Sequence, residues 1–177
     1  AVIDATHPFA EEISRNAAQA TERAGVPRMV LMRRPWNFVQ PDKVQHFRSI
    51  NAVVAELQGR GERIFLAIGR QEVNQFNELT DRFFLLRFID APQTPPLFAD
   101  CHVLTGRPGG YDDERRMLQQ FAIDTLVAKN GGSDASRAKI DAALDLGISV
   151  LLIDPPSPPP PPHADSIDAA LDWLETA

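Results

Sequence analysis

The feature that most constrains the fold is an alternation of short apolar segments with helical segments between residues 63 and 153. The apolar segments have the length of strands, and the last is continuously apolar, as in strands buried on both faces of a sheet. They occupy residues 63–68, 83–89, 101–105, 125–128 and 148–153, and helices are expected between them at 71–78, 112–121 and 135–146. Strands that alternate with helices predict a wound, parallel α/β sheet.

The two ends of the chain predict further elements. Residues 1–5 have the pattern of a buried strand already under way, so we expect an N-terminal segment to be absent. Pro8 suits the first position of a helix that runs to Gly25, with Phe9, Ile13, Ala17 and Ala20 at helical spacing. A strand is expected at 28–32, and Ser49 opens a short helix.

Two segments differ from this pattern. Residues 33–47 are polar with interspersed aromatic residues and show no clean period. Residues 155–162 are proline except for Ser157, which predicts a stiff polyproline II spacer and, as an alternative of lower weight, a ligand for a proline-reading domain. A last helix is expected at 166–174, with Ile167, Ala170, Leu171 and Leu174 on one face docked on the domain.

Composition narrows the class of protein. The 177 residues are 44% hydrophobic and 24% charged, as in ordinary globular proteins, and the formal charge of −6 implies no general attraction to nucleic acid or anionic membranes. Cys101 stands alone, and there is neither a signal-peptide pattern nor an apolar run long enough to span a bilayer. We therefore predict a cytoplasmic protein, and no nucleic-acid or membrane partner.

The first group of candidate functional residues follows the first strand. Asp4, Thr6 and His7 place a carboxylate, a hydroxyl and an imidazole beside the start of a helix, where a polar ligand can bind. An equally weighted interpretation is structural: Thr6 or His7 caps the helix and Asp4 binds nearby amides. The spacing alone does not decide between them.

Two more groups follow later strands. Gly69 lets a ligand approach the backbone and Arg70 offers a planar fork for phosphate or carboxylate, although such a glycine is more often a plain turn. Lys129-Asn130-Gly131-Gly132 can form an amide-lined anion nest with Lys139 nearby, or a tight turn with solvated lysines.

Several chemistries are excluded by missing patterns. The sequence has no P-loop, no G-x-G-x-x-G and no G-x-S-x-G nucleophile elbow. The histidines His7, His46, His102 and His163 are scattered, and none pairs with Cys or another His at ligand spacing, so no metal site is predicted.

Taken in order, the motifs resemble one family. Residues 3–10 read Ile-Asp-Ala-Thr-His-Pro-Phe-Ala, and Arg34-Pro35-Trp36, Gly69-Arg70-Gln71, Arg87-Phe88-Ile89-Asp90, Lys129-Asn130-Gly131-Gly132 and Ala138-Lys139 follow. Together, from Val2 to about Ile153, they resemble the precorrin-6A reductase family. The resemblance implies two Rossmann-like lobes with mainly parallel sheets and a ligand cleft between them, NADPH as cofactor, and hydride transfer to one double bond of the precorrin-6A macrocycle in cobalamin biosynthesis.

The same resemblance suggests a domain division and residue roles. Residues 1–60 would be the remainder of the N-terminal lobe, 61–154 the second lobe, 155–165 a Pro-rich spacer and 166–177 a C-terminal helix, in a monomer. The cofactor would contact Thr6, His7, Pro8, Gly69 and Arg70. The substrate would contact Arg87, Tyr111, Lys129, Asn130, Gly131, Gly132 and Lys139. The proton donor stays open among Asp4, His7, Lys129 and an ordered water.

The sequence also departs from the family pattern. The initial strand and its Gly-Gly-Thr turn, which meets the cofactor phosphates, are absent, so we expect an incomplete cofactor site in residues 1–177. The glycines after Asn130 come one place early, and residues 106–111 read Gly-Arg-Pro-Gly-Gly-Tyr instead of an Arg-Gly-Pro-Phe pattern. The residues do not indicate whether the macrocycle carries cobalt. The alternatives are a non-catalytic tetrapyrrole- or nucleotide-binding α/β module and, with less support, a phosphoreceiver domain.

Overall fold

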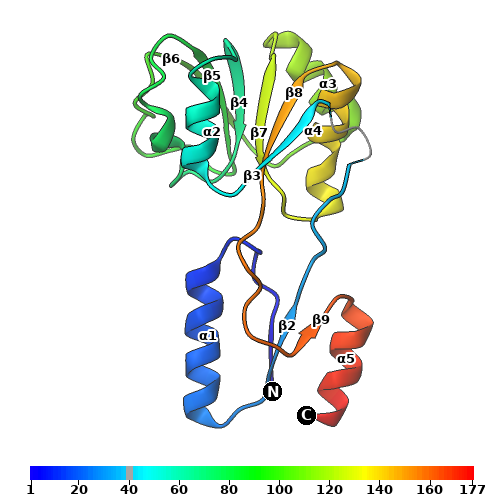
Figure 1. The fold of residues 1–177 in the computed structure, drawn as a ribbon. Helices are drawn as coiled ribbons and strands as arrows, with labels where there is room; N and C mark the ends of the chain where they lie inside the picture. Colours follow the sequence, from blue (N-terminus) through cyan, green and yellow to red (C-terminus); the bar gives the residue numbers. More distant parts are fainter. Residues whose placement is uncertain (39–41) are drawn as a thin grey trace. The chain divides into compact units, whose positions relative to one another are not determined.

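The computed structural model describes residues 1–38 and 42–177 and divides the chain into two compact units (Figure 1). The small unit comprises Ala1–Trp36 and Pro155–Ala177, and the large unit comprises Asn37–Asp154. The strands of both units pair in parallel. The expected α/β fold with parallel sheets is therefore confirmed.

The large unit is built on a six-stranded sheet in the order β3-β8-β7-β4-β5-β6. Its strands are β3 (Val44–Phe47), β4 (Arg63–Ala67), β5 (Phe83–Phe88), β6 (Asp100–Thr105), β7 (Thr125–Lys129) and β8 (Ser149–Ile153). The central strands are apolar at consecutive positions because helices and loops cover both faces: Phe65, Leu85 and Leu151, for example, are fully buried.

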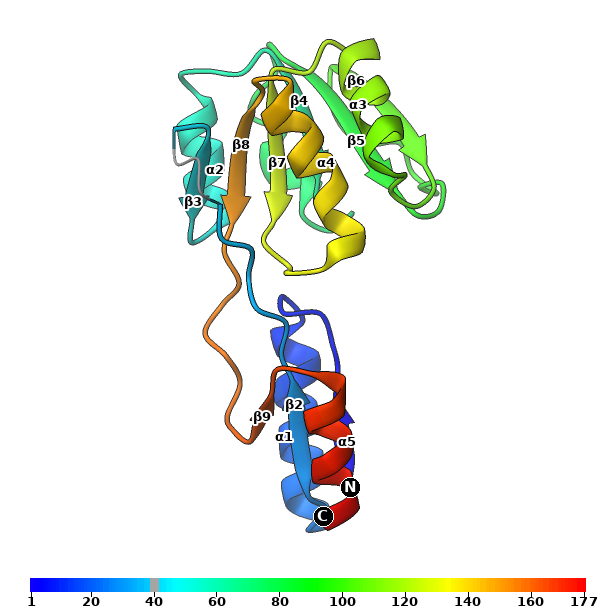
Figure 2. The same ribbon diagram turned by 90° about the vertical axis from the view of Figure 1, so that its right-hand side faces the viewer.

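Helices lie on both faces of this sheet (Figure 2). The chain runs across the sheet from β3 to β6 through α2 (Ile50–Leu57) and the short 3-10 helix η1 (Val73–Phe76), then returns through α3 (Tyr111–Gln120) and α4 (Asp134–Asp145). Because parallel crossovers are right-handed, the reversal puts α3 and α4 on the face opposite α2. The reversal also makes β4 and β7 the neighbouring strands whose following connections diverge, and ligands bind at such points in open α/β sheets.

Because β3 belongs to the large sheet, the boundary between the two units lies earlier in the chain than expected. Val44–Phe47 lie in the stretch for which no period was found, yet β3 pairs with β8 along its whole length. Residues 37–60 thus belong to the large unit and not to an N-terminal lobe that ends at residue 60. The pairing partner is more than 100 residues away in sequence, which local periodicity cannot detect.

The small unit is built on a three-stranded sheet in the order β1-β2-β9. Its strands are β1 (Val2–Asp4), β2 (Arg28–Leu31) and β9 (His163–Ala164), and its helices α1 (Glu11–Ala24) and α5 (Ile167–Thr176) cover opposite sides of the sheet (Figures 1 and 2). The end of the Pro-rich segment takes part in the sheet, because the carbonyl of Pro162 accepts from the Val30 amide. This segment and α5 therefore belong to the small unit and are not a separate spacer and helix.

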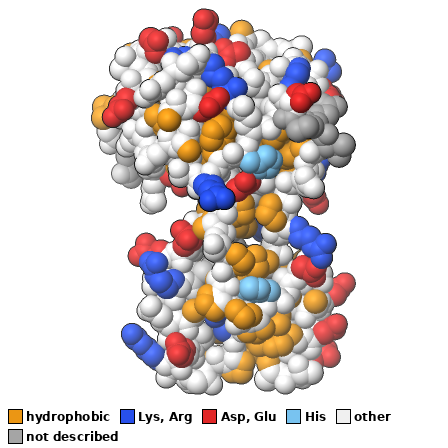
Figure 3. Space-filling model, in the orientation of Figure 1, with side chains coloured by type: hydrophobic (Ala, Val, Ile, Leu, Met, Phe, Trp, Pro, Cys, Tyr) orange, Lys and Arg blue, Asp and Glu red, His pale blue; other side chains and the backbone are white. Residues whose placement is uncertain are grey.

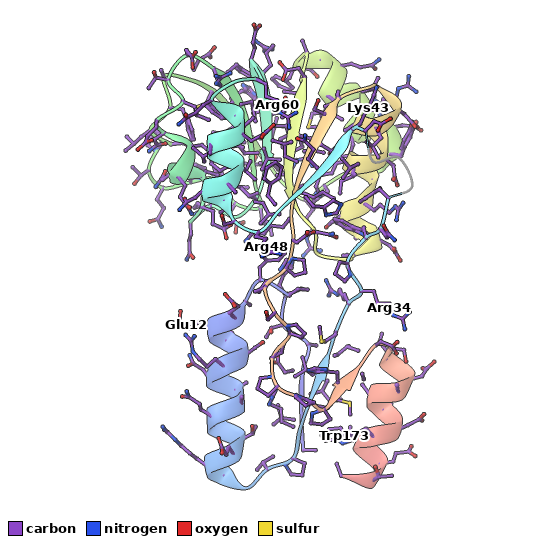
Figure 4. The ribbon with its side chains drawn as sticks, viewed as in Figure 1. Glu12, Arg34, Lys43, Arg48, Arg60 and Trp173 are labelled. Carbon is purple, nitrogen blue, oxygen red and sulfur yellow. The ribbon has the colours of Figure 1, made fainter. Side chains whose placement is uncertain are left out.

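The inward faces of the two helices differ from those expected. In α1 the buried residues are Ser14 and Thr21, whereas Ile13 is 59% exposed. In α5 Ala170 is buried and Trp173 packs with it, while Ile167, Leu171 and Leu174 are exposed. Figure 4 shows Trp173 on the sheet side of α5, and Figure 3 shows hydrophobic side chains gathered on the visible face of the small unit. A three-stranded sheet covers only a narrow stripe of each helix, so the remaining apolar positions stay accessible.

The other expected elements are present with small shifts. The segment at 71–78 forms only η1, and Pro8 lies in a turn before α1, which begins at Glu11 and not at Pro8. Ser49 caps α2 by accepting from the Ala52 amide, as its residue type predicts. Among the described helices, none is both long and apolar enough to cross a membrane.

Candidate functional site

One group of polar residues in the large unit lies at the carboxyl ends of its strands. At the divergence of β4 and β7, Lys129 ends β7 and its Nζ pairs with the Glu72 carboxylate. The other oxygen of Glu72 accepts from the Gly69 amide at 3.0 Å. A Cβ at position 69 would lie 2.8 Å from Glu72 Oε2, so glycine allows this close approach. The group therefore joins the turns after two neighbouring strands.

A second polar group adjoins it at the ends of β3, β7 and β8. Asp154 Oδ1 accepts from the Asn130 amide nitrogen at 3.1 Å and lies 2.8 Å from His46 Nδ1. Asn130 is 1% exposed, and its backbone amide donates to the Ile153 carbonyl. Asn130 is thus positioned by its strand neighbours, while the His46 and Asp154 side chains reach the surface.

The loop after Asn130 has the geometry of a tight turn. The Gly131 amide donates to the Lys129 carbonyl at 2.9 Å, and Gly132 adopts a φ of +67°, which favours glycine. The turn leads directly into α4, whose first turn carries Ser136. The N-terminal amides of a helix attract anions, which agrees with the expected anion site but does not by itself identify a ligand.

Arg70 lies beside a cavity of about 340 Å³. Its Nη2 donates to the Asp90 carbonyl at 2.7 Å, and its guanidinium lies over the Phe88 ring at 5.3 Å from the ring centre. The other walls of the cavity come from η1 and from the proline-rich loop 92–97. The walls combine apolar residues with the polar side chains of Asn74, Gln93 and Thr94, and apolar walls with a few polar groups are typical of ligand pockets.

Arg87 and Lys139 line a second, smaller pocket at the ends of β4, β5 and β6. Arg87 is held by Glu114 of α3 through two contacts of 2.7 and 3.0 Å. Lys139 of α4 is 7% exposed, and burial lowers its pKa from 10.5 to about 8. Tyr111 does not line this pocket: its hydroxyl donates to Asp145, the last residue of α4, at 2.5 Å, and this hydrogen bond raises the pKa of the phenol.

In the small unit, Asp4 organises the turn after β1. Its Oδ1 accepts from the Thr6 amide at 3.2 Å and from the Thr6 hydroxyl at 2.8 Å, and the Thr6 hydroxyl also contacts Ser14. Burial opposes the charged carboxylate, but the hydrogen bonds from Thr6 and Ser14 and the charge of Arg28 outweigh it and lower the pKa of Asp4. Asp4 therefore stays ionised at neutral pH.

His7 follows in the same turn and is exposed. Its Nδ1 accepts from the Phe9 amide at 3.3 Å, so in the neutral ring the proton is on Nε2. Pro8 and Phe9 complete the turn that leads into α1. Asp4 thus has the structural role of accepting hydrogen bonds from the turn that follows it, which the spacing of the sequence did not decide. The same turn leaves His7 exposed to solvent.

The structure brings some predicted residues together and adds others. Gly69, Lys129 and Asn130 share one edge of the large sheet, whereas Asp4, Thr6, His7 and Pro8 belong to the small unit. Sequence reasoning missed Glu72, Glu114, His46 and Asp154. Only Asp154, which directly follows an expected strand, had a local signal; the other three act through partners far away in sequence. Among described residues, no group of three or more His, Cys, Asp or Glu could hold a metal ion.

The fold and these residues define an α/β protein whose basic, glycine-containing turns lie at the carboxyl ends of parallel strands, where open α/β sheets bind ligands. Residues 1–175 match the family model described as "Precorrin-6x reductase CbiJ/CobK". The chain belongs to this precorrin-6x reductase family.

Individual relatives agree with the family model. The chain is 42% identical over 178 residues to the precorrin-6A reductase of Rhodococcus erythropolis, covering 99% of this chain and 71% of the relative. The solved structure titled "CobK precorrin-6A reductase" has 34% identity and a TM-score of 0.92, covering 98% of this chain and 72% of that one. The cobalt-precorrin-6A reductase of Priestia megaterium is more distant, at 27% identity over 88% of this chain and 65% of the relative.

Proposed function

We propose that this protein is a precorrin-6A reductase that transfers a hydride from NADPH to one double bond of precorrin-6A in cobalamin biosynthesis. The observation that carries the proposal is the match to the reductase family over residues 1–175, with relatives near 40% identity across almost the whole chain. The strand order of the large unit, with diverging connections at β4 and β7, supports a Rossmann-like lobe. The β1-α1-β2 arrangement supports a second one.

The proposed cofactor contacts come from both units. In the large unit, we assign Arg70 to the phosphate or nicotinamide part of the cofactor. It lies beside a cavity of about 340 Å³, which is within the size range of small-molecule sites. Gly69, next to it, allows the Glu72 carboxylate to approach the backbone and so fixes the turn that carries Arg70. In the small unit, Thr6, His7 and Pro8 form the turn after β1. A ligand cleft between two lobes stays a prediction, which variants on both units can test.

The hydride chemistry is supplied by NADPH when it is bound, and the protein orients the substrate, excludes water and handles a proton. Of the proton donors considered, Asp4 is ionised and buried, and Lys129 is paired with Glu72. His7 is exposed, and a histidine side chain in its protonated form can act as a general acid. We therefore favour His7, or a water that it orders, as the donor.

The substrate contacts are assigned to the basic side of the large unit. A tetrapyrrole with several carboxylates needs local cations because the chain has a formal charge of −6. Arg87, Lys129 and Lys139 supply these cations, Tyr111 and Gly132 contribute to the surrounding surface, and the buried Asn130 and Gly131 fix the turn after β7. The higher identity to precorrin-6A than to cobalt-precorrin-6A reductases favours the cobalt-free substrate.

The direct test is NADPH oxidation on addition of precorrin-6A to the full-length gene product. We expect stoichiometric loss of NADPH absorbance and a product two hydrogens heavier. Binding of both ligands without turnover would contradict the proposal and support the alternative, a non-catalytic tetrapyrrole- or nucleotide-binding module. A cytoplasmic monomer stays a prediction, checked by fractionation and by sedimentation.

Variants separate the roles. Arg70→Gln and Thr6→Ala are each expected to raise the KM for NADPH about tenfold, whereas Arg116→Gln, exposed on α3, should leave it unchanged. Lys129→Gln should raise the KM for precorrin-6A. If Arg70→Gln and Lys129→Gln leave both Michaelis constants at the wild-type value, the assigned roles are wrong. An effect of Thr6→Ala without an effect of Arg70→Gln would argue against a cleft formed by both units.

A further inference from the structure

A pocket of about 200 Å³ opens on the α4 side of the large sheet, at the carboxyl ends of β4, β5 and β6. Its walls are mainly apolar or backbone, and include Phe65, Ile68 and Pro108. Its polar lining comes from Arg87 of β5 and from Ser136 and Lys139 of α4. Pockets for whole drug-sized ligands measure about 300–1,000 Å³, so this one suits a single side group of a larger molecule.

Lys139 is a buried cation that the protein satisfies only in part. It is 7% exposed, and its Nζ donates to the Ser136 carbonyl at 2.8 Å. An ammonium group carries three N–H donors, and the hydrogen bonds found among the described residues employ one of them. Burying an ammonium with unused donors is costly unless a partner arrives. A ligand oxygen in the pocket would supply that partner.

The charges around the pocket leave an excess of one positive charge. Arg87 and Lys139 contribute two cations, and Glu114 of α3 contributes one anion. Glu114 is committed to protein partners: it holds Arg87 Nη1 and accepts from the Gly109 amide at 2.8 Å. The last contact fixes the loop that carries Pro108, so the pocket wall and its charges form one built structure.

We infer that this pocket is a subsite for one carboxylate side chain of the substrate, bound by the Lys139 ammonium beside the Arg87–Glu114 pair. The inference rests on the proposed function for the identity of the substrate. A carboxylate carries one negative charge and so neutralises the excess charge, whereas a phosphate dianion would leave the pocket negative. The apolar walls accommodate the methylene groups of an acetate or propionate arm.

The subsite couples binding to the uptake of a proton. The pKa of Lys139 is lowered to about 8, mainly by burial; Glu114 opposes this shift and Arg87 adds to it. Tyr111, a further titratable group on α3, donates its hydroxyl to Asp145. A bound carboxylate stabilises the ammonium and raises the pKa. Above about pH 8 the free pocket is neutral at Lys139, so a carboxylate then binds only together with a proton.

The test uses propionate as the probe, titrated into the isotope-labelled protein and followed by amide shifts of Ser136, Lys139 and Gly106. Neutral propionamide and inorganic phosphate are titrated in parallel. We expect saturable shifts with propionate alone, and an affinity about tenfold lower at pH 9 than at pH 7, as the protonated fraction of a group with a pKa of about 8 falls.

Variants make the test specific. Lys139→Met should weaken propionate binding at least about tenfold at pH 7, and Lys139→Arg should bind equally at both pH values because arginine stays charged. Lys43→Met is the matched control: Lys43 precedes β3 at the opposite, amino-terminal edge of the sheet (Figure 4) and should leave binding unchanged. If Lys139→Met does not fold, the flat pH profile of Lys139→Arg carries the test.

Several results would overturn the inference. These are propionamide binding as tightly as propionate, phosphate binding more tightly, or Lys139→Met binding propionate like the wild type. The titrations contain neither NADPH nor precorrin-6A, so their failure leaves the proposed reductase activity standing. Conversely, a protein that binds propionate at Lys139 but does not oxidise NADPH would retain the carboxylate subsite and refute the proposed function.

Discussion

The small unit and the large unit each bury an ionisable side chain near a strand-to-helix connection, and the two are held differently. Asp4 is 4% exposed and Lys139 is 7% exposed. Asp4 accepts two hydrogen bonds from Thr6 and lies 3.9 Å from Arg28, so its pKa is lowered and it keeps its charge. Lys139 has one carbonyl partner, so burial lowers its pKa toward neutrality and its charged form is disfavoured.

The difference teaches that burial alone does not decide what a charged residue does. A buried charge with protein partners stabilises the fold, and removing it leaves those partners unsatisfied. A buried charge with unused donors costs stability and is useful only if a ligand completes its environment. Asp4 is of the first kind and Lys139 of the second, so substitutions at the two positions should change stability in opposite directions.

The largest effect is expected for Asp4→Ala. Loss of the carboxylate leaves Arg28 and the Thr6 donors uncompensated, which should lower the free energy of unfolding by about 4 kcal/mol. Both tryptophans, Trp36 and Trp173, lie in the small unit, so denaturation followed by tryptophan fluorescence reports on it. Asp172→Ala, exposed on α5, is the control.

The pH dependence gives this prediction a second check. Because the pKa of Asp4 is lowered in the folded state, its contribution is complete above its unfolded pKa and is lost as pH falls through the folded value. The difference in stability between the wild type and Asp4→Ala should therefore narrow in acid. A constant gap between them at every pH would show that the carboxylate charge is not the stabilising feature.

Lys139→Met should act in the opposite direction. The folded pKa of about 8 lies below the unfolded value of 10.5, so the wild type is least stabilised below pH 8 and gains stability as pH rises between these values. At pH 7 the methionine variant should be more stable by up to about 3 kcal/mol, and the gain should vanish near pH 11. Urea denaturation followed by circular dichroism measures this. If the methionine variant is less stable than the wild type at pH 7, Lys139 is, like Asp4, a buried charge that stabilises the fold.

A smaller effect is expected where Gly69 meets Glu72. The Cβ of Gly69→Ala would lie 2.8 Å from Glu72 Oε2 and displace the carboxylate that pairs with Lys129. We expect kcat/KM for NADPH to fall about tenfold, with stability reduced by less than about 1 kcal/mol. Gly59→Ala is the matched control, because its Cβ would meet nothing within 4 Å. Equal activity of the two variants would show that the turn at Gly69 is not part of the cofactor site.

The smallest effects are expected for alanine substitutions of one helix cap in each unit. Ser166 caps α5 by accepting from the Ala169 amide, and Ser49 caps α2 in the same way. Each alanine substitution should cost about 1 kcal/mol. Ser166→Ala should move the tryptophan-detected transition, and Ser49→Ala should move only the transition seen by circular dichroism. Coincident shifts in both variants would show that the two units unfold together.

The elements of the large sheet could largely be predicted from the sequence. Its central strands are buried on both faces, so their residues are continuously apolar and are interrupted by helical periods and glycines. The strand ends followed from the same pattern, and they place Gly69, Lys129 and Asn130 at one edge. β3 escaped detection because Gln45 and His46 are exposed and only its pairing with β8 makes it a strand.

Residue types and their local order determined that the chain alternates strands with helices and that Ser49 begins a helix. They also determined which turns carry glycines and basic residues. Neighbouring positions suffice for this because backbone preferences and burial periodicity are short-range properties of the sequence. The tertiary structure decided which charges meet. The Arg87–Glu114 and Lys129–Glu72 pairs join residues 27 and 57 positions apart. The unused donors of Lys139 likewise arise only when α4 and the ends of three strands close around one pocket, because packing between distant segments sets the solvent and the partners of each charge.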